Sequence, residues 1–413
     1  MPGPLDGVLV VDLTRALAGP HAGMMLGDLG ARVVKVESPG SGDDSRGWGP
    51  PFVQPEGGRR ESTYFLSANR NKESIALDLK DDGDREVLTE LLRRADVLLE
   101  NFRPGTLARL GFGNEMLAEL NPRLIVLSIS GFGHDGPEGG RAGYDQIAQG
   151  EGGLMSLTGP GPDDPQKVGV PISDLLAGMY GAYGVVAALY ERERTGRGQV
   201  VRTSLLAAVV GVHAYQGTAW TVGGKVNRAQ GNHHPSIAPY GLFHCSDGSV
   251  QLACGSEGLW RRLAAEFGLD AEMPGFATNG ERVARREELV ELLERTFADI
   301  PAADLLDRLT SAGVPAGKVR PVDEVYGWDQ TLSQGLLVDV DHRTLGAVQL
   351  PGPPLRFFAA AADGETETTR RDHVAPPPLD ADGAAIRAWL RGDGAADGVP
   401  QPAEDDLEDG HAT

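Results

Sequence analysis

The sequence predicts an α/β protein with a Rossmann-like, parallel-sheet large domain and a smaller α+β domain. Two observations support this fold class. Short apolar runs alternate with helical patterns over the first 130 residues, and the first of these runs is followed by a glycine-bearing turn and helix. Such alternation indicates parallel strands joined by crossover helices, because parallel neighbours cannot be connected by a tight turn. The large domain is expected to cover residues 1–224.

The elements of the large domain follow in order along the chain. Strands are predicted from buried apolar runs at Gly7–Leu13, Ala31–Glu37, Ser74–Leu79, Val97–Asn101, Leu124–Ser130 and Gln199–Ser204. Helices are predicted at Ala22–Gly30, at Arg85–Arg94, from Asp174 and from Leu205.

The smaller α+β domain is expected at residues 225–325. It should contain a strand, three helices and an extended piece, at Gly248–Ala253, Trp260–Phe267, Arg286–Phe297, Asp304–Ala312 and Val314–Val322. Residues 326–390 are expected to return and pack on the large domain. Residues 391–413 contain the acidic run PAEDDLEDGHAT, whose composition predicts a disordered tail.

Composition limits the possible partners. The 413 residues carry a formal net charge of −21, which argues against nucleic acid, because phosphate binding needs a basic face. An anionic cofactor would need a local pocket of basic side chains and backbone N–H groups. No run of eighteen apolar residues and no basic N-terminal region occur, so neither a membrane span nor a signal peptide is expected. The two cysteines, Cys245 and Cys254, form no metal cluster and favour a reducing cytoplasm.

Several familiar enzyme motifs are missing. The first strand is followed by TRALAGPHAG, which lacks the G-x-G-x-x-G spacing of a dinucleotide fingerprint. The sequence also lacks a Walker A loop, a G-x-S-x-G elbow and an H-E-x-x-H motif. Nicotinamide, flavin and metal cofactors are therefore not expected.

Asp174 is the single most informative residue. It follows a short apolar run and opens a long helix rich in glycine and alanine, ISDLLAGMYGAYGVVAALYERERTGRGQ. Backbone N–H groups and the positive end of the helix dipole favour an ionised carboxylate there. From the residues alone, Asp174 is either a helix N-cap or a positioned nucleophile or base.

Nine segments in this order give the chain a strong family resemblance: PLDGVLVVDLTRALAGP, LGDLGARVVKVESPGSGD, NRNKESIALDLK, ADVLLENFRPG, LARLGF, LNPRLIVLSISGFG, SDLLAGMYGAYGVVAALYERERTGRGQ, HPSIAPYGLF and GVPAGKVRPVDEV. Together they resemble the family III CoA-transferases, the formyl-CoA transferase and carnitine CoA-transferase group. The resemblance implies two chains interlocked as a homodimer, with acyl-CoA and a small carboxylic acid as substrates.

The resemblance also implies the reaction and its residues. Asp174 corresponds to the family nucleophile, which forms a mixed anhydride and then an aspartyl-CoA thioester. The CoA pocket would comprise Leu17, Ala18, Leu77, Lys80, Asn101, Phe102, Arg103, Arg109 and Tyr144. Arginine and lysine side chains suit phosphates, and Phe102 suits adenine. Lys72 and Arg46 are weaker candidates for the same anion pocket.

The chain departs from the formyl-CoA enzyme at several points. Ser38 stands where an arginine is common, Leu17 replaces a glutamine, PPPLDADG stands near the end, and AQGNHHPSIAPYG replaces a run of glycines. In that last segment we expect Gly231 to give a mobile cover, and His233 and His234 to line the acceptor pocket. These changes argue against oxalate and formate as substrates.

Two alternative functions remain open. The sister α-methylacyl-CoA racemases pair their carboxylate with a histidine, but here Tyr144 occupies that position in AGYDQIAQ. A phenol exchanges protons poorly near neutral pH, which disfavours two-base racemisation. The other alternative is a non-catalytic acyl-CoA-binding protein that has kept the fold.

Overall fold

The structure is a computed structural model that describes residues 3–55, 58–361 and 364–392. The chain forms two compact units. Unit 2 consists of Gly153–Val168 and Tyr215–Leu332, and unit 1 consists of the rest. The predicted acidic tail at 391–413 lies almost entirely outside the described residues.

These units differ from the predicted boundaries after residues 224 and 325. The segment 153–168 belongs to unit 2 because its backbone pairs with that unit. Ala229 donates its N–H to the Ser156 carbonyl at 3.0 Å, and Gly231 donates to Gly159 at 2.9 Å. Sequence periodicity could not reveal these contacts, since they join loops far apart along the chain.

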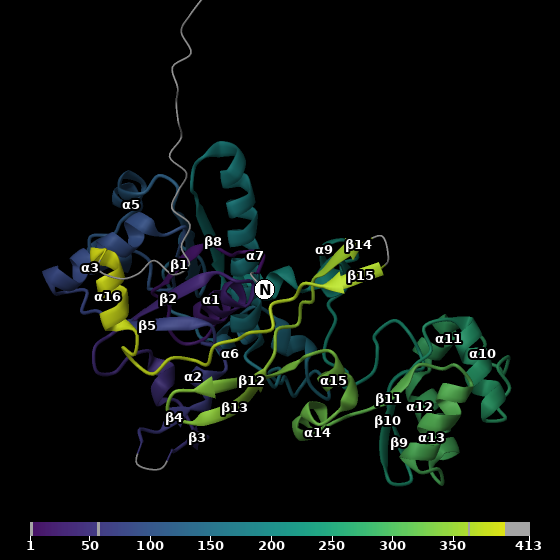
Figure 1. Cartoon of the computed structure of the whole chain (residues 1–413). Coiled ribbons are helices and arrows are strands. Elements are labelled where there is room, and N and C mark those ends of the chain that lie inside the picture. Colours follow the sequence, from purple (N-terminus) through teal and green to yellow (C-terminus); the bar gives the residue numbers. More distant parts are fainter. Residues whose placement is uncertain (1–2, 56–57, 362–363, 393–413) are drawn as a thin grey trace, which may run out of the picture. The chain divides into compact units, whose positions relative to one another are not determined.

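Unit 1 is built on a sheet of six parallel strands (Figure 1). Their order across the sheet is β5 (Lys72–Ala76), β2 (Arg32–Glu37), β1 (Leu9–Asp12), β6 (Val97–Glu100), β7 (Ile125–Ser130) and β8 (Val200–Ser204). All six predicted strands are present, and the parallel α/β class is confirmed. The strand order reverses between β1 and β6, and a crevice opens at such a switch point beyond the carboxyl ends of the strands.

Helices cover both faces of this sheet. One face packs against α1 (Ala18–Asp28), α6 (Asp145–Glu151), α7 (Ile172–Thr195) and α8 (Leu205–Gly211). The other packs against α3 (Asp82–Arg94), α5 (Asn114–Leu120) and α16 (Gly383–Arg391). The chain after Ser333 therefore returns to unit 1, where α16 lies beside α3 (Figure 1).

The start of α1 differs from the predicted helix, Ala22–Gly30. The helix begins at Ala18, with Pro20 inside its first turn. Proline is tolerated there because the first N–H groups of a helix have no partner within it. The chain therefore enters the helix immediately after the loop that follows β1.

Glycines of α7 allow close packing of α1 on this helix. A Cβ atom on Gly178 would lie 2.5 Å from the Ala18 carbonyl oxygen, and one on Gly181 would lie 2.8 Å from Leu127. Gly178 thus allows α1 to approach α7 closely, and Gly181 allows α7 to approach strand β7. Within the described residues, α7 is the one helix long and apolar enough to cross a membrane by length and composition alone, and nearly half of that apolar span is buried inside the protein.

Unit 2 contains a three-stranded antiparallel sheet and several helices. The strands are β9 (Tyr240–Cys245), β10 (Gly248–Ala253) and β11 (Ala316–Lys318). The helices are α10 (Glu257–Glu266), α11 (Asn279–Ala284), α12 (Arg286–Phe297), α13 (Ala302–Ser311), α14 (Val322–Tyr326) and α15 (Asp329–Ser333, which ends one residue into unit 1); α9 (Ala214–Thr221) leads into the unit. Of these helices, α10, α12 and α13 contribute buried residues to a shared core with the sheet, among them Trp260, Leu293 and Phe297.

The remaining elements of unit 1 are short. They are η1 (Asp44–Gly47), α2 (Thr63–Leu66), α4 (Thr106–Arg109) and the antiparallel pairs β3 (Phe52–Val53) with β4 (Glu61–Ser62), β12 (Leu337–His342) with β13 (Gly346–Pro351), and β14 (Phe358–Ala361) with β15 (Gly364–Glu367). A short 3₁₀ turn, η2 (Leu154–Leu157), lies in unit 2.

Candidate active site

A cavity of about 540 Å³ lies at the carboxyl ends of the sheet strands in unit 1. We call it the switch-point cavity, because its walls include the segments that follow β1 and β6, Arg15–Ala18 and Asn101–Pro104. Its other lining residues are Asp44, Trp48, Tyr64, Ile129–Gly131, Gly140–Gln146, Asp174 and Leu205. This is the place where an open parallel sheet of this strand order offers a ligand site.

Most of the predicted site residues of unit 1 meet in this cavity. Those that line it are Leu17, Ala18, Asn101, Phe102, Arg103, Tyr144 and Asp174. The residues come from four separate segments, which only the folded sheet brings together. Tyr144 is 72% exposed and precedes the first turn of α6, so its ring is open to a ligand.

Three predicted CoA-binding residues do not line the cavity. Leu77 is 2% exposed and packs in the apolar core on the α3 face. Lys80 is exposed in the loop before α3. Arg109 is exposed and donates a hydrogen bond to Thr106 Oγ1 at 2.8 Å.

Lys72 and Arg46, the weaker candidates for the anion pocket, form ion pairs within the protein. The expectation that they bind a phosphate is wrong. Lys72 is buried and its Nζ lies 2.9 Å from Asp12 Oδ2, while it also donates to the carbonyl of Pro20 at 2.8 Å. Arg46 forms a bidentate pair with Glu37, with both distances 2.7 Å. Buried charges need such partners, so neither side chain is available to a phosphate.

Gly231, His233 and His234 belong to unit 2, where both histidines have structural contacts. The ring of His233 lies edge-on to Phe243 at 5.6 Å between centroids. His234 stacks on Tyr215 and Tyr240, with centroid separations of 5.9 and 5.1 Å. Burial, with Arg286 nearby, lowers the pKa of both imidazoles. Gly231 has a φ of 65°, in the left-handed region that glycine adopts more readily than other residues.

Asp174 is the third residue of α7, and the N-cap is Pro171. Its side chain is therefore not the cap. Asp145 takes that role instead: its Oδ1 accepts the N–H of Ser173 at 2.7 Å and that of Asp174 at 3.4 Å. Asp145 Oδ2 accepts from Gln149 at 2.7 Å. The carboxylate of Asp145 is thus fixed among the free N–H groups of the helix that carries Asp174.

The pKa of Asp174 is raised to about 7 by burial and by the negative charge of Asp145. The expectation that the helix N-terminus keeps this carboxyl firmly ionised near neutral pH is therefore wrong. Removal from water disfavours the charged form, and a second carboxylate adds repulsion. The Asp174 carboxyl therefore titrates close to neutral pH, and its ionised form is poorly solvated.

Sequence reasoning missed several residues of this site, among them Arg15, Arg141, Asp145, Trp48 and Tyr64. Asp145 stood inside the quoted segment AGYDQIAQ, and its acidic side chain beside Tyr144 was the available signal. Trp48 and Tyr64 line the cavity with ring centroids 4.9 Å apart, edge to face. Burial, Asp174, Asp145 and Asp43 raise the pKa of Tyr64 to about 12, so its phenol stays protonated and can donate a hydrogen bond.

Comparisons with known proteins identify the family. The model of CoA-transferase family III matches residues 5–382. The mouse protein named succinyl-CoA:glutarate CoA-transferase is 39% identical over 378 residues, which cover 91% of this chain and 84% of that protein. Acetyl-CoA:oxalate CoA-transferase of Acetobacter aceti is 40% identical over 388 residues, covering 93% and 95%. A crystal structure of a CaiB/BaiF family protein from Brucella suis is 42% identical, with a TM-score of 0.82, and the match covers 94% of this chain and 100% of that one. The resemblance read from the sequence is thereby confirmed: the chain belongs to CoA-transferase family III and is a CoA-transferase enzyme.

Proposed function

We propose that this CoA-transferase moves CoA from an acyl-CoA thioester to a carboxylic acid through covalent intermediates on Asp174. The observation that carries the proposal is the Asp174 carboxyl itself, partly buried in the switch-point cavity with a pKa raised to about 7. An ionised carboxylate that is poorly solvated is a stronger nucleophile than one in water.

The reaction proceeds in balanced steps. The ionised Asp174 oxygen attacks the thioester carbonyl carbon, the C–S bond breaks, and CoA thiolate leaves behind an acyl-aspartyl anhydride. The thiolate then attacks the aspartyl carbonyl and expels the donor as its free carboxylate, which leaves an aspartyl-CoA thioester. The acceptor carboxylate repeats the two steps in reverse, and Asp174 returns to its ionised form.

The cavity supplies groups that suit these steps. The protonated phenol of Tyr64 can donate to an oxygen that gains negative charge in a tetrahedral intermediate. Arg15, Arg103 and Arg141 line the same cavity and can bind phosphates of CoA or a substrate carboxylate.

The relatives favour dicarboxylic substrates. Relatives named succinyl-CoA:glutarate CoA-transferase and succinyl-CoA:mesaconate CoA-transferase are 38–40% identical to this chain. We therefore propose a dicarboxylyl-CoA donor and a dicarboxylic acceptor, with one of the cavity arginines on the free carboxylate. Because the relative named for oxalate is equally similar, oxalate belongs in the test even though the sequence argued against it.

We also propose that two copies associate through α7 in the cytoplasm. One face of this helix leaves apolar side chains exposed: Met179, Tyr180, Tyr183, Val186 and Tyr190. Their spacing of three and four residues forms a continuous stripe. A contiguous apolar stripe marks an interaction surface, and the long hydrophobic stretch of α7 is explained by a second copy without a bilayer.

A screen of donors against acceptors in deuterated water tests the reaction. Succinyl-, acetyl- and longer acyl-CoAs are mixed with glutarate, mesaconate, oxalate and monocarboxylates. We expect acyl-CoA exchange that requires the acceptor. Incorporation of α-deuterium into an (R)-2-methylacyl-CoA without any acceptor supports the racemase instead, and tight CoA binding with neither reaction supports a binding protein.

A further inference from the structure

Four consecutive residues, Arg15 to Ala18, line the switch-point cavity. A strand turns alternate residues to opposite faces, so four neighbours reach one space only where the chain bends sharply. The bend is at Ala16, whose φ is 68°. In this left-handed region the Cβ atom of an L-residue crowds the following carbonyl oxygen, so alanine rarely adopts it.

Side chains from two other segments hold the backbone that leads into this bend. Asp43 Oδ1 accepts the N–H of Ala16 at 3.1 Å. Asn101 accepts the N–H of Arg15 at 2.9 Å and donates to its carbonyl oxygen at 2.8 Å. The conformation of Ala16 is therefore imposed by its surroundings.

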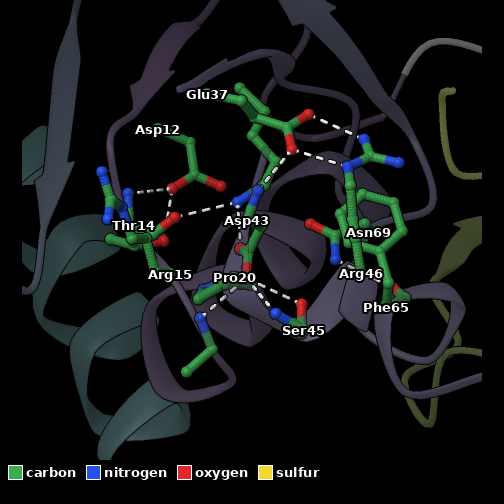
Figure 2. A network of polar contacts seen from close by, with 12 residues as sticks. Asp12, Thr14, Arg15, Pro20, Glu37, Asp43, Ser45, Arg46, Phe65 and Asn69 are labelled. Carbon is green, nitrogen blue, oxygen red and sulfur yellow. Dashed lines mark hydrogen bonds and ion pairs between the residues drawn. The ribbon is translucent and has the colours of Figure 1, made fainter. Parts of the chain in front are cut away.

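Asp43 is itself fixed by buried charges (Figure 2). Its Oδ2 lies 2.8 Å from Lys35 Nζ, and both side chains are fully buried. Glu37, paired with Arg46, accepts the N–H of Asp43 at 2.9 Å. Burial alone would raise the pKa of Asp43, but Lys35 and hydrogen bonds from Ser45 lower it below its usual value. The residue is an ionised anchor.

We propose that Asp43 is a positioning residue for acyl-CoA: it holds Ala16 in the left-handed conformation and so aims Arg15 and the start of α1 at the thioester substrate. This inference rests on the proposed function, since it takes the switch-point cavity as the acyl-CoA site. A strained backbone that persists beside a cavity is usually over-determined by its neighbours, as it is here.

Asp43→Asn tests the anchor with almost no change in shape. Both carboxylate oxygens only accept: Oδ1 takes the N–H groups of Ala16 and Ser45, and Oδ2 faces Lys35. An amide has one accepting oxygen, so one of these sides must meet an NH2 group. The variant should bind CoA and turn over acyl-CoA about tenfold less well, as expected when one charge-assisted contact is lost.

Ala16→Gly provides a rescue that a merely structural role would not give. Glycine adopts the left-handed conformation freely, whereas alanine is disfavoured there by about five- to thirtyfold. In Asp43→Asn/Ala16→Gly, CoA affinity and kcat/KM should therefore recover by about fivefold or more. The matched control is Ala214→Gly in the Asp43→Asn background. Ala214 also has a positive φ, 47°, but does not line the cavity, so it should rescue nothing.

Hydrogen exchange of the peptide that contains Ala16 gives a readout independent of activity. Exchange should be faster in Asp43→Asn than in the wild type. The amide either turns its NH2 group toward the N–H of Ala16 or leaves Lys35 without an accepting oxygen, and each arrangement weakens the anchor. If Asp43→Asn does not fold, Lys35→Met is combined with it, because this change removes the buried ammonium group that an amide cannot neutralise, and Ala16→Gly should again restore CoA affinity.

Two results overturn the inference: unchanged exchange and CoA affinity in Asp43→Asn, or a loss of CoA affinity that Ala16→Gly does not reduce. Failure of the proposed function looks different. In that case the wild-type protein neither binds nor transfers CoA, while exchange at Ala16 still responds to Asp43→Asn.

Discussion

Asp145 accepts the backbone N–H of Asp174 and, by its negative charge, helps to raise the pKa of the Asp174 carboxyl to about 7. The two carboxyl groups thus have different tasks. Asp145 is held by the N–H groups at the start of α7 and by Gln149, whereas the Asp174 side chain has no hydrogen bond to any residue that the structure describes. Two acids of one site with separated environments can provide one fixed charge and one reactive group.

The pH profile of the reaction should show this pairing. Since Asp174 must be ionised to attack, kcat/KM should rise with pH through about 7. Asp145→Asn removes one of the two causes of the raised pKa and should move this rise to lower pH; burial, the larger cause, remains. The measurement is kcat/KM between pH 5 and 9 for both proteins, and an unmoved profile would show that Asp145 does not tune the nucleophile.

Asp174→Asn should stabilise the fold at high pH. The folded-state pKa of about 7 lies above the usual value of 3.8 for an aspartate, so the unfolded chain ionises first and stability falls as pH rises from about 4 to 7. The amide avoids this loss. At pH 8 the variant should gain at most about 4 kcal/mol in the free energy of unfolding, and at pH 4 almost nothing. Urea unfolding at both pH values checks this, and an equal gain at both would contradict it.

Two arginines test whether the switch-point cavity, and not family resemblance alone, marks the CoA-binding residues. Arg103 lines the switch-point cavity and Arg109 does not. Arg103→Gln should raise KM for the acyl-CoA donor by about tenfold, the cost of one charge-assisted hydrogen bond. Arg109→Gln is the matched control and should raise it less. A larger rise in KM for Arg109→Gln would contradict this prediction, because it would place CoA outside the switch-point cavity.

The exposed stripe of α7 should hold two copies together. Tyr183 and Tyr190 are 74% and 70% exposed, and replacing both by glutamate puts charge into the proposed interface. We expect wild-type protein to sediment as a dimer and the double variant as a monomer. Val374→Glu, at a residue 54% exposed away from α7, is the control and should stay dimeric.

Much of the fold was predictable because the sheet is buried on both faces. Its inner strands, such as Leu9–Asp12 and Ile125–Ser130, are buried and mostly apolar runs, and such runs can be recognised locally. The start of α1 was misplaced because Pro20 suits both a loop and a first helical turn. The inclusion of 153–168 in unit 2 depends on contacts between distant loops.

The candidate site was only partly predictable. Asp174 stood out by its position before a long helix, and the family resemblance supplied its role. The raised pKa of Asp174 depends on burial and, to a smaller extent, on Asp145, which reaches α7 from another helix, so no local pattern shows it. Lys72 and Arg46 looked like phosphate ligands because their buried partners, Asp12 and Glu37, lie on other elements and no local pattern pairs them.

The central claim is that Asp174 carries the covalent intermediate. The most direct measurement is mass spectrometry of the peptide containing Asp174 after brief incubation with an acyl-CoA donor and no acceptor. We predict CoA attached to Asp174 in the wild type, its disappearance when an acceptor acid is added, and no adduct in Asp174→Asn. An adduct that persists in Asp174→Asn, or full transfer activity of that variant, would contradict the account.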